Sequence, residues 1–233
     1  MAHVTMPTSS AQTKTLGTSM TKLKLWGSLI LVLIVVGGGL YGWWALDLRW
    51  RPKTITRNQA QIAALLQRSG WVSPGLKGPQ IYEIGFRSCP DCIRLRLEEF
   101  PRYWKANVDT RMILVARRDY NGVSKSTPAE RSTVAELWFN RSWKLLEKWE
   151  DTPIDAWTAP GIPAADNDAA RSAVVEQGRQ LVAEITPLLA ANGVDNHGFR
   201  YPTLVWWDRQ GHMRACACEQ RQTYRFVRKE LGA

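Results

Sequence analysis

The longest hydrophobic stretch of the chain is an unbroken apolar run near the N-terminus. It extends over 22 residues from Leu25 to Leu46 and contains no charged side chain. A run of this length matches what a helix needs to cross a hydrocarbon core of about 30 Å. Residues 1–24 are rich in Thr, Ser, Ala and Met without an apolar period, which predicts a disordered tail. The pattern therefore predicts a tail followed by one transmembrane helix.

The alternative to an anchor is a cleaved signal peptide. Such a peptide has a shorter apolar core of roughly 7 to 15 residues and a small-x-small cleavage site. Neither feature is evident here, which favours an uncleaved anchor. Residues 47–70 are then predicted to be a basic linker that ends in a short amphipathic helix from about Asn58 to Arg68.

The next apolar runs are short and strand-like. They extend over residues 79–86 and 111–118, and they enclose a charged helical segment that starts beside Cys89. Pro101 lies within this segment, where we expect a kink or a break. Strand, helix and strand at this spacing predict a parallel βαβ unit with a right-handed crossover.

Helices and then a hairpin are predicted for the rest of the chain. The stretch Thr127–Glu130 has an N-cap, a proline in the first turn and a capping-box Glu, and an apolar stripe continues from it to about Glu150. A further helix is expected from about Asp168 to Ala191. The strands of the hairpin are expected at Thr203–Trp207 and His212–Cys216, before a C-terminal helix.

Most of the positive charge flanks the apolar run. The formal net charge is +10, and residues 1–58 hold seven Lys or Arg against one Asp, so six of the ten charges lie there. This placement is typical of a protein that meets a lipid bilayer and argues against a nucleic-acid partner. Three basic residues precede the run closely and four follow it, so the positive-inside rule does not decide the orientation.

Cysteine usage indicates the compartment. The chain has four cysteines, two of them in Cys89-Pro90-Asp91-Cys92 at the predicted strand-to-helix junction. Paired thiols are typical of an oxidising space, where they form disulfides. We therefore expect a single-pass protein of a bacterial inner membrane, with a cytoplasmic N-terminus and a periplasmic domain. A structural disulfide and half of a metal site are the alternatives for this pair.

A βαβ unit with Cys-x-x-Cys at its first junction, then helices, a proline, a β-hairpin and a final helix, resembles the thioredoxin fold. The segments Cys89–Asp119 and Lys125–Glu150 are further similar to the catalytic domains of the periplasmic disulfide isomerases DsbC and DsbG. The resemblance implies an α/β, thioredoxin-like domain over residues 71–233 with a helical insertion at about residues 121–200.

The chain departs from that family in two ways. About 42 residues separate the apolar run from Cys89, too few for the N-terminal dimerisation domain of DsbC and DsbG. Asp91 also stands where the family usually has Tyr, and the same tetrad occurs in a cytosolic thioredoxin-related reductase. The dimer that the family uses for isomerisation is therefore not implied.

In the resembling geometry, Cys89 lies at a helix N-terminus, where free N–H groups and the helix dipole favour a thiolate and lower its pKa. We expect Cys89 to be the nucleophile and Cys92, one turn further, to resolve the mixed disulfide. Pro90 restricts the loop. The carboxylate of Asp91 would raise the pKa of Cys89 and make the couple more reducing, and the charge of Arg87 would oppose this effect.

Three further residues take their roles from the resemblance. Glu83 matches a buried carboxylate of thioredoxin and DsbA-type enzymes that takes a proton from the inner cysteine; the alternative is a Glu paired with a surface Arg. Pro202 matches the family's cis-proline across from the reactive cysteine, and Tyr201 would help to shape the substrate groove. The alternative for Pro202 is a trans proline that opens an edge strand.

Cys216 and Cys218 are not supplied by the resemblance. A turn at Asp208–Gly211 would pair Thr203 with Cys216 and place Pro202 beside the end of the Cys-Ala-Cys. Alternate residues of a strand have Cα atoms about 6.5 Å apart, near the upper limit for a disulfide. We expect a second dithiol that exchanges with the first pair. The alternatives are two buried small residues and a zinc site made by all four cysteines.

These features predict a membrane-anchored, DsbG-like thiol-disulfide oxidoreductase of the reductase or isomerase type. It would act on extracytoplasmic proteins with thiols or disulfides, would need no organic cofactor and no metal, and would exchange electrons with a redox partner in the membrane or the periplasm. Two alternatives stay open. One is a thiolate domain that binds or delivers a metal, and the other is a thioredoxin-fold interaction subunit of an envelope assembly such as a secretion or conjugation apparatus.

Overall fold

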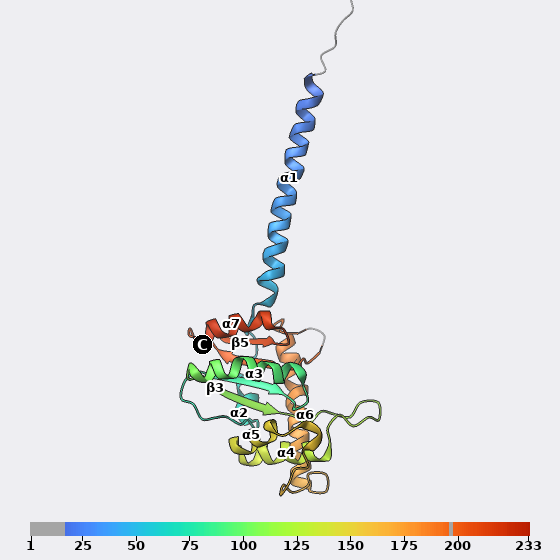
Figure 1. Cartoon of the computed structure of the whole chain (residues 1–233), viewed down its shortest axis with the longest axis vertical. Helices are drawn as coiled ribbons and strands as arrows, with labels where there is room; N and C mark the ends of the chain where they lie inside the picture. Colours follow the sequence, from blue (N-terminus) through green and yellow to red (C-terminus); the bar gives the residue numbers. More distant parts are fainter. Residues whose placement is uncertain (1–16, 196–197) are drawn as a thin grey trace, which may run out of the picture. The chain divides into compact units, whose positions relative to one another are not determined.

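The computed structural model describes residues 17–195 and 198–233, and the chain divides into two compact units, Met1–Arg49 and Trp50–Ala233 (Figure 1). The described part of the first unit is formed mainly by the helix α1 (Gly17–Leu46). The stretch Trp26–Trp50 is long and apolar enough to cross a membrane, by length and composition.

The helix α1 starts earlier than expected. It begins at Gly17 rather than at Leu25, so the last part of the predicted tail is helical. Lys, Leu and Met in residues 18–24 are good helix formers, and they extend a helix that the apolar run has already nucleated. The rest of the predicted tail lies outside the described residues.

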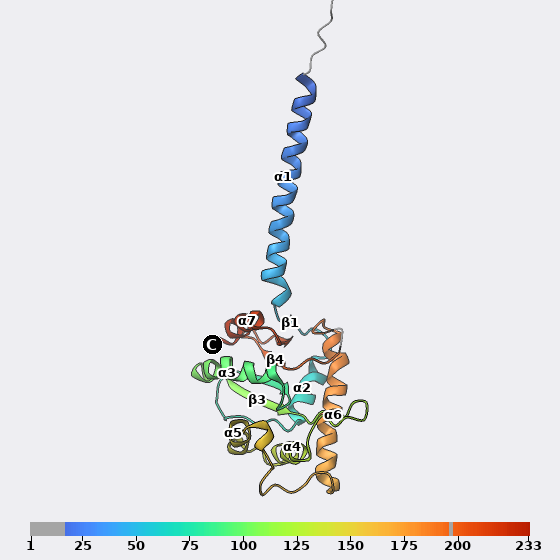
Figure 2. The same ribbon diagram turned by 45° about the vertical axis from the view of Figure 1, so that its right-hand side comes forward.

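The second unit is built on one mixed sheet with the strand order β1-β5-β4-β2-β3 (Figures 1 and 2). The strands β2 and β3 are parallel and are joined by α3, whereas β4 pairs antiparallel with β2, β5 with β4, and β1 with β5. The predicted βαβ unit is therefore confirmed. The bounds are β1 (Lys53–Thr54), β2 (Gln80–Gly85), β3 (Asp109–Leu114), β4 (Thr203–Trp207), β5 (Met213–Ala217) and α3 (Pro90–Lys105).

Helices cover both faces of this sheet. The helices α2 (Gln59–Arg68) and α6 (Ala169–Ala190) contribute to the core on one face, and α3 and α7 (Arg221–Leu231) contribute to the core on the other. Successive side chains of a strand point to opposite faces, so Tyr82 and Ile84 of β2 face the α2 and α6 side. Ile81 and Glu83 face the α3 side, which places a carboxyl group beneath the cysteines.

The predicted helical insertion separates β3 from β4. It contains α4 (Pro128–Asn140), α5 (Trp143–Asp151), the 3-10 turn η2 (Ile154–Ala156) and α6. In both ribbon views, α4 and α5 lie together at the end of the unit away from α7. The insertion thus brings α5 close to α3, where Glu150 lies beside Arg96.

The expected domain boundary at residue 71 is wrong. The strand β1 pairs with β5, and the side chains of Ile55, Ile62 and Leu66 are fully buried, so the compact unit begins at Trp50. Packing the apolar side of α2 against the sheet removes apolar surface from water. This burial stabilises the folded state by about 25 cal/mol per Å². Residues 50–70 of the expected linker are therefore part of the second unit.

The expected single helix up to Glu150 is two helices. Thr127 and Glu130 form the predicted capping box at the start of α4. The helix then ends because Arg141 adopts a left-handed conformation with φ 49°, and Ser142 caps α5 by accepting a hydrogen bond from the N–H of Leu145 at 3.2 Å. The helix α3, in contrast, continues through Pro101 without a break.

Candidate active site

Cys89 is the N-cap of α3. Its Sγ accepts a hydrogen bond from the backbone N–H of Cys92 at 3.1 Å, and Pro90 occupies the first turn of the helix. The two cysteines form a disulfide with a Cα–Cα distance of 5.2 Å, and both are buried. A sulfur at this position meets the free N–H groups and the positive end of the helix dipole, which favours a thiolate when the disulfide is reduced.

The charge of Asp91 is matched by a residue that the sequence analysis did not consider. Arg94 Nη2 lies 2.6 Å from Asp91 Oδ1, one turn along α3. The same guanidinium donates a hydrogen bond to the carbonyl of Glu219. Asp91 therefore does not face the cysteines as an isolated negative charge, and the i,i+3 spacing is the sequence signal that could have shown this pair.

Arg87 points into the inserted helices. Its guanidinium donates to the carbonyl of Thr152 and lies over the rings of Trp149 and Trp157, at 5.1 Å and 5.7 Å from their centroids. Burial lowers the pKa of Arg87. The residue that was expected to offset Asp91 thus also makes cation–π contacts with the insertion.

Glu83 lies on β2 directly behind the cysteines. A methyl group placed on Gly85 would lie 3.0 Å from Glu83 Oε1 and 3.1 Å from Cys92 Sγ, so these two atoms are at most 6.1 Å apart. Gly85 is therefore the residue that lets them approach. Burial raises the pKa of Glu83 to about 7, against the opposing effect of the Arg96 charge. Glu83 does lie beside an Arg, Arg96, but the two side chains are only 2% and 8% exposed, so the alternative of a Glu paired with a surface Arg is wrong.

Arg96 and Glu150 complete the surroundings of Glu83, and sequence reasoning missed both. Arg96 Nε lies 3.4 Å from Glu83 Oε1, and Arg96 Nη1 lies 2.5 Å from Glu150 Oε2. Arg96 follows Cys92 by four residues on α3, so both point to the same side of the helix. A cation at a core position of an amphipathic helix was the available signal. Nothing in the sequence indicated that Glu150 would reach this site, because it belongs to the inserted helix α5.

Tyr201 and Pro202 lie at the same end of the sheet as the cysteines. The peptide bond between them is cis, as the resemblance implied. The ring of Tyr201 packs edge-on against Phe86 at 5.0 Å and against Phe199 at 4.9 Å, and Arg117 lies over the ring of Phe86 at 4.1 Å. Burial raises the pKa of Tyr201 to about 12. These contacts form an aromatic border beside the strand that leads to the first cysteine pair.

The register expected for the hairpin is wrong by one residue. Thr203 pairs with Ala217 and Leu204 pairs with Cys216, whereas the expected partner of Thr203 was Cys216. The reason is a longer turn: Asp208 Oδ1 accepts from the N–H groups of Gln210 and His212, which adds one residue to the loop.

Cys216 and Cys218 form a second disulfide at the end of β5. Their Cα atoms are 5.2 Å apart, less than in a regular strand, because β5 ends at Ala217. Both residues are buried, and the N–H of Cys218 donates to the carbonyl of Pro202 at 2.8 Å. The second pair therefore lies beside Pro202, at the same end of the central strands as the first pair.

The described residues contain no group of three or more His, Cys, Asp or Glu arranged to hold a metal ion, and all four cysteines are in the two disulfides. The two pairs are separate in this structure. They do not form the shared four-thiolate arrangement that a zinc site would need.

Comparisons with known proteins add distant structural similarities. No protein-family model and no curated protein matches the chain. The structure is similar to BcfH of Salmonella enterica Typhimurium, with a TM-score of 0.49, 11% identity and 93% of each chain covered. It is also similar to Proteus mirabilis ScsC in a compact conformation, with a TM-score of 0.44, 11% identity, and 88% of this chain and 97% of that chain covered.

These TM-scores are below 0.5, so the similarities carry no argument about activity. The strand order, the parallel βαβ unit, the Cys-x-x-Cys at the start of α3 and the proline before β4 give the second unit a thioredoxin-like fold with a helical insertion. One N-terminal apolar helix precedes it in the chain.

Proposed function

We propose that this chain is a membrane-anchored thiol-disulfide oxidoreductase of the reductase or isomerase type, DsbG-like in its catalytic domain. The observation that carries the proposal is the Cys89–Cys92 pair at the first turn of α3, with the buried carboxyl of Glu83 at most 6.1 Å from Cys92 Sγ. A sulfur at a helix N-terminus, a second sulfur one turn further and a proton acceptor behind it are the groups that thiol-disulfide exchange uses.

The exchange begins with the reduced pair. The thiolate of Cys89 attacks one sulfur of a client disulfide, and the other client sulfur leaves as a thiolate. Glu83 then accepts the proton of the Cys92 thiol, and Cys92 attacks Cys89 and releases the second client sulfur. The client gains two electrons, and the protein becomes the Cys89–Cys92 disulfide. A redox partner in the membrane or periplasm returns the pair to its reduced form.

The direction of electron flow is measured by the reduction potential of the Cys89–Cys92 pair. A value near about −270 mV corresponds to a reductant, and a value near about −120 mV corresponds to an oxidant. A reductase requires a potential toward the lower end of this range, whereas an isomerase is expected at a less reducing value, near about −180 mV.

We place the client polypeptide along Tyr201, Pro202, Pro90 and Asp91. This placement is supported by the aromatic contact of Tyr201 with Phe86, which borders the strand leading to Cys89. An extended client segment laid here would present its disulfide to the N-terminus of α3.

We assign α1 as the membrane anchor, with the N-terminus in the cytoplasm and the thioredoxin-like unit in the periplasm of a bacterium. The length and apolarity of the helix support the anchor, and two disulfides support an oxidising compartment. A membrane-impermeant thiol reagent should label Cys89 in intact spheroplasts after mild reduction. Labelling that occurs only after lysis would reverse the assigned orientation.

The assigned roles of Cys89 and Cys92 are tested by trapping. In Cys92→Ala the resolving thiol is missing, so mixed disulfides with client proteins should accumulate, whereas Cys89→Ala should form none. Diagonal non-reducing gels of the two variants would show the difference. Equal adduct levels in both variants would contradict the assignment, and unchanged function of Cys89→Ser in the cell would favour an interaction subunit.

Cys216 and Cys218 are proposed as a second dithiol that exchanges two electrons with the first pair. The hydrogen bond from Cys218 to Pro202 supports this, because it places the second pair at the active-site end of the central strands. The double variant Cys216→Ser/Cys218→Ser should then shift the reduction potential or turnover of Cys89–Cys92. An unaltered potential and turnover would leave only a packing role.

A further inference from the structure

Arg96 is shared between two carboxyl groups that come from different parts of the fold. Its Nε lies 3.4 Å from Glu83 Oε1 on β2, and its Nη1 lies 2.5 Å from Glu150 Oε2 on α5. The side chain of Glu83 is 2% exposed and that of Glu150 is 25% exposed. A row of carboxyl, guanidinium and carboxyl therefore runs from behind Cys92 to a position that water can reach.

The guanidinium is held more closely at the outer end of this row. Glu150 makes the shorter contact, and Arg96 Nη2 donates to the carbonyl of Phe86 at 3.5 Å. Within the described part of the chain, the oxygens of Glu83 and the Nε and Nη1 atoms of Arg96 make no hydrogen bond, so both contacts of the guanidinium with carboxyl groups are ion pairs, and the one to Glu150 is shorter. The ion pair of Arg96 with Glu83 is therefore the weaker of the two, and Glu150 competes with Glu83 for the positive charge of Arg96.

Few other charges face Glu83. Its strand neighbours on β3 and β4 are the apolar Met112 and Leu204. The helix α3 contributes Cys92 and Arg96 on this side, and α5 contributes Glu150. Arg87, from the loop before α3, faces Arg96 and Glu150, and its guanidinium donates to the carbonyl of Thr152.

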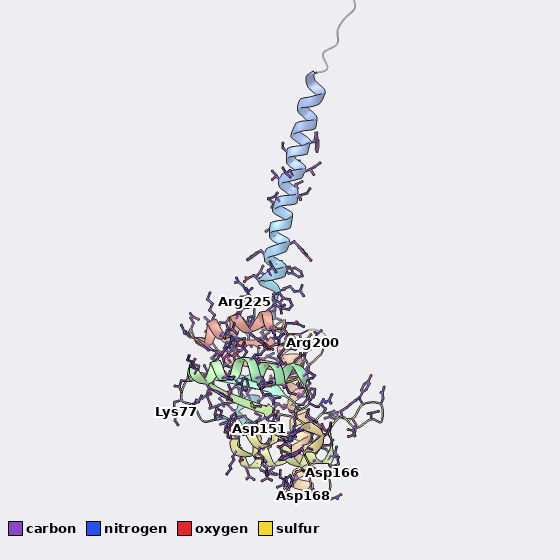
Figure 3. The ribbon with its side chains drawn as sticks, viewed as in Figure 1. Lys77, Asp151, Asp166, Asp168, Arg200 and Arg225 are labelled. Carbon is purple, nitrogen blue, oxygen red and sulfur yellow. A yellow bond between two sulfur atoms is a disulfide. The ribbon has the colours of Figure 1, made fainter. Side chains whose placement is uncertain are left out.

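A solvent-open groove with a volume of about 470 Å³ reaches the outer half of the row. It lies between α3 and α5 and is lined by both Arg96 and Glu150. Figure 3 labels Asp151, the chain neighbour of Glu150 at the end of α5, below α3 in that view. Glu150 can therefore respond to solvent or to a bound chain, while Glu83 stays enclosed.

We propose that Arg96 and Glu150 control when Glu83 can accept the proton of Cys92, so that the inserted helix α5 is a working part of the redox site. This inference rests on the proposed function. Glu83 must be a carboxylate before it can take the proton, and the positive charge of Arg96 favours the carboxylate. Glu150 acts in the opposite direction, because it holds Arg96 toward the surface and adds a negative charge. Both are positioning residues.

The controlled step is the resolution of the mixed disulfide. The proton moves from the Cys92 thiol to the Glu83 carboxylate, and the Cys92 thiolate forms a bond to Cys89 Sγ. The bond between Cys89 and the client sulfur breaks, and the client sulfur leaves with the electron pair as a thiolate. The two cysteines are oxidised to a disulfide, and the client is reduced.

The test uses the full chain in detergent micelles with ¹³C-labelled glutamate. The titration of the Glu83 carboxyl is followed by NMR, with Glu83→Gln to assign the signal. In Arg96→Met the midpoint should rise by about one pH unit or more, because a nearby opposite charge is lost. In Glu150→Gln it should fall by a smaller amount, and Arg96→Lys should lie closer to the wild type than Arg96→Met.

The same variants are then tested for resolution with Ellman's reagent. In a Cys216→Ser/Cys218→Ser background, which leaves only the first pair of thiols, the reduced protein releases one thionitrobenzoate when Cys89 is modified and a second when Cys92 attacks the mixed disulfide. The pH profile of the second release should move upward in Arg96→Met and downward in Glu150→Gln. Glu184→Gln is the control: this exposed carboxyl on α6 pairs with Arg68 on the other side of the sheet, so the variant should leave both the NMR midpoint and the profile unchanged.

Opposite midpoint shifts in Arg96→Met and Glu150→Gln support the inference, because a general disturbance of the structure would not make the two shifts differ in sign. Shifts in the same direction, or a Glu83 midpoint that Glu150→Gln does not move, would overturn it. If Arg96→Met does not fold, Glu150→Gln and Arg96→Lys still decide the outcome. If the midpoints move as expected but the Cys216→Ser/Cys218→Ser background itself never releases the second thionitrobenzoate, the proposed function fails, and the assigned control of Cys92 fails with it.

Discussion

The two disulfides of this protein span the same Cα–Cα distance and differ in their surroundings. Both have a Cα–Cα distance of 5.2 Å, and both are buried at the same end of the central strands of the sheet. Cys89 Sγ accepts a hydrogen bond at the N-terminus of α3, and Cys92 has Glu83 behind it. Within the described residues, no hydrogen bond reaches the sulfur of Cys216 or Cys218, and both pack in an apolar core.

Under the proposed function, this difference concerns how directly each pair can exchange with a client disulfide. A disulfide reacts readily when one sulfur can leave as a stabilised thiolate and when a proton acceptor lies near the other. The first pair has both features, and the second has only a backbone hydrogen bond from Cys218 to Pro202. Each of the following predictions tests one part of this difference.

The largest difference is expected in the exchange reaction. Cys89→Ser removes the nucleophile and should lower the rate of client disulfide reduction by at least about 10³-fold, the order seen when an enzyme loses a covalent nucleophile. Cys216→Ser/Cys218→Ser should stay within about tenfold of the wild-type rate. Reduction of a fluorescent disulfide peptide measures both. Similar losses in the two variants would remove the distinction between the pairs.

The next difference concerns the pH dependence of stability. Burial raises the pKa of Glu83 from 4.5 to about 7, so between these values the folded protein holds a proton that the unfolded chain has lost. The Glu83 contribution is therefore complete below pH 4.5 and is lost as the pH rises through 7, with a change of roughly 3 kcal/mol at 1.36 kcal/mol per pKa unit.

Glu83→Gln should remove this pH-dependent contribution, so the difference in unfolding free energy between variant and wild type should change with pH over that window. Cys216→Ser/Cys218→Ser should run parallel to the wild type, since Glu83 is unchanged in that variant. Guanidinium unfolding in micelles at several pH values provides the measurement. A difference for Glu83→Gln that does not vary with pH would contradict the shifted carboxyl.

The third prediction concerns the stability that each disulfide contributes. Closing the three-residue loop from Cys216 to Cys218 should be worth roughly 1.5 kcal/mol through the entropy of the unfolded chain, so the double serine variant should lose about that amount. Reducing only Cys89–Cys92 should cost less, because the folded protein then gains a thiolate at the N-terminus of α3. A greater loss for the first pair, in guanidinium unfolding, would reverse the comparison.

The smallest effect is expected at the ion pair on α3. Arg94→Gln leaves Asp91 without its partner, so the thiolate of Cys89 should form at a higher pH, by at most about 0.7 pH units for a partly exposed pair. Asp91→Asn should move the same transition downward. The rate of alkylation of the reduced protein as a function of pH would show both. Movement of both variants in the same direction would contradict the assigned charges.

Several elements follow from local sequence alone. The apolar run predicts α1, the stretch Thr127–Glu130 predicts the start of α4, and the runs on both sides of the Cys-x-x-Cys predict β2, α3 and β3. These features depend on neighbours only a few residues apart, through side-chain period, capping and backbone preference. The place of Cys89 at the start of α3 belongs to this class.

Other predictions from local sequence were wrong. The membership of β1 and α2 in the domain depends on a sheet face assembled from distant segments. The hairpin register depends on how the side chain of Asp208 binds the turn. Both outcomes result from contacts that only form once the chain has folded.

The candidate site also has features that local sequence predicts and features that depend on the folded structure. The identity of Cys89 and Cys92, and of a carboxyl at residue 83, can be read in the sequence because strand, turn and helix are contiguous there. The protonation state of Glu83 cannot be read in the sequence, because it depends on burial and on the charges of Arg96 and Glu150. Glu150 lies 67 positions away along the chain and reaches the site through α5. Electrostatic effects depend on distance and on exclusion of water, and both are properties of the folded molecule.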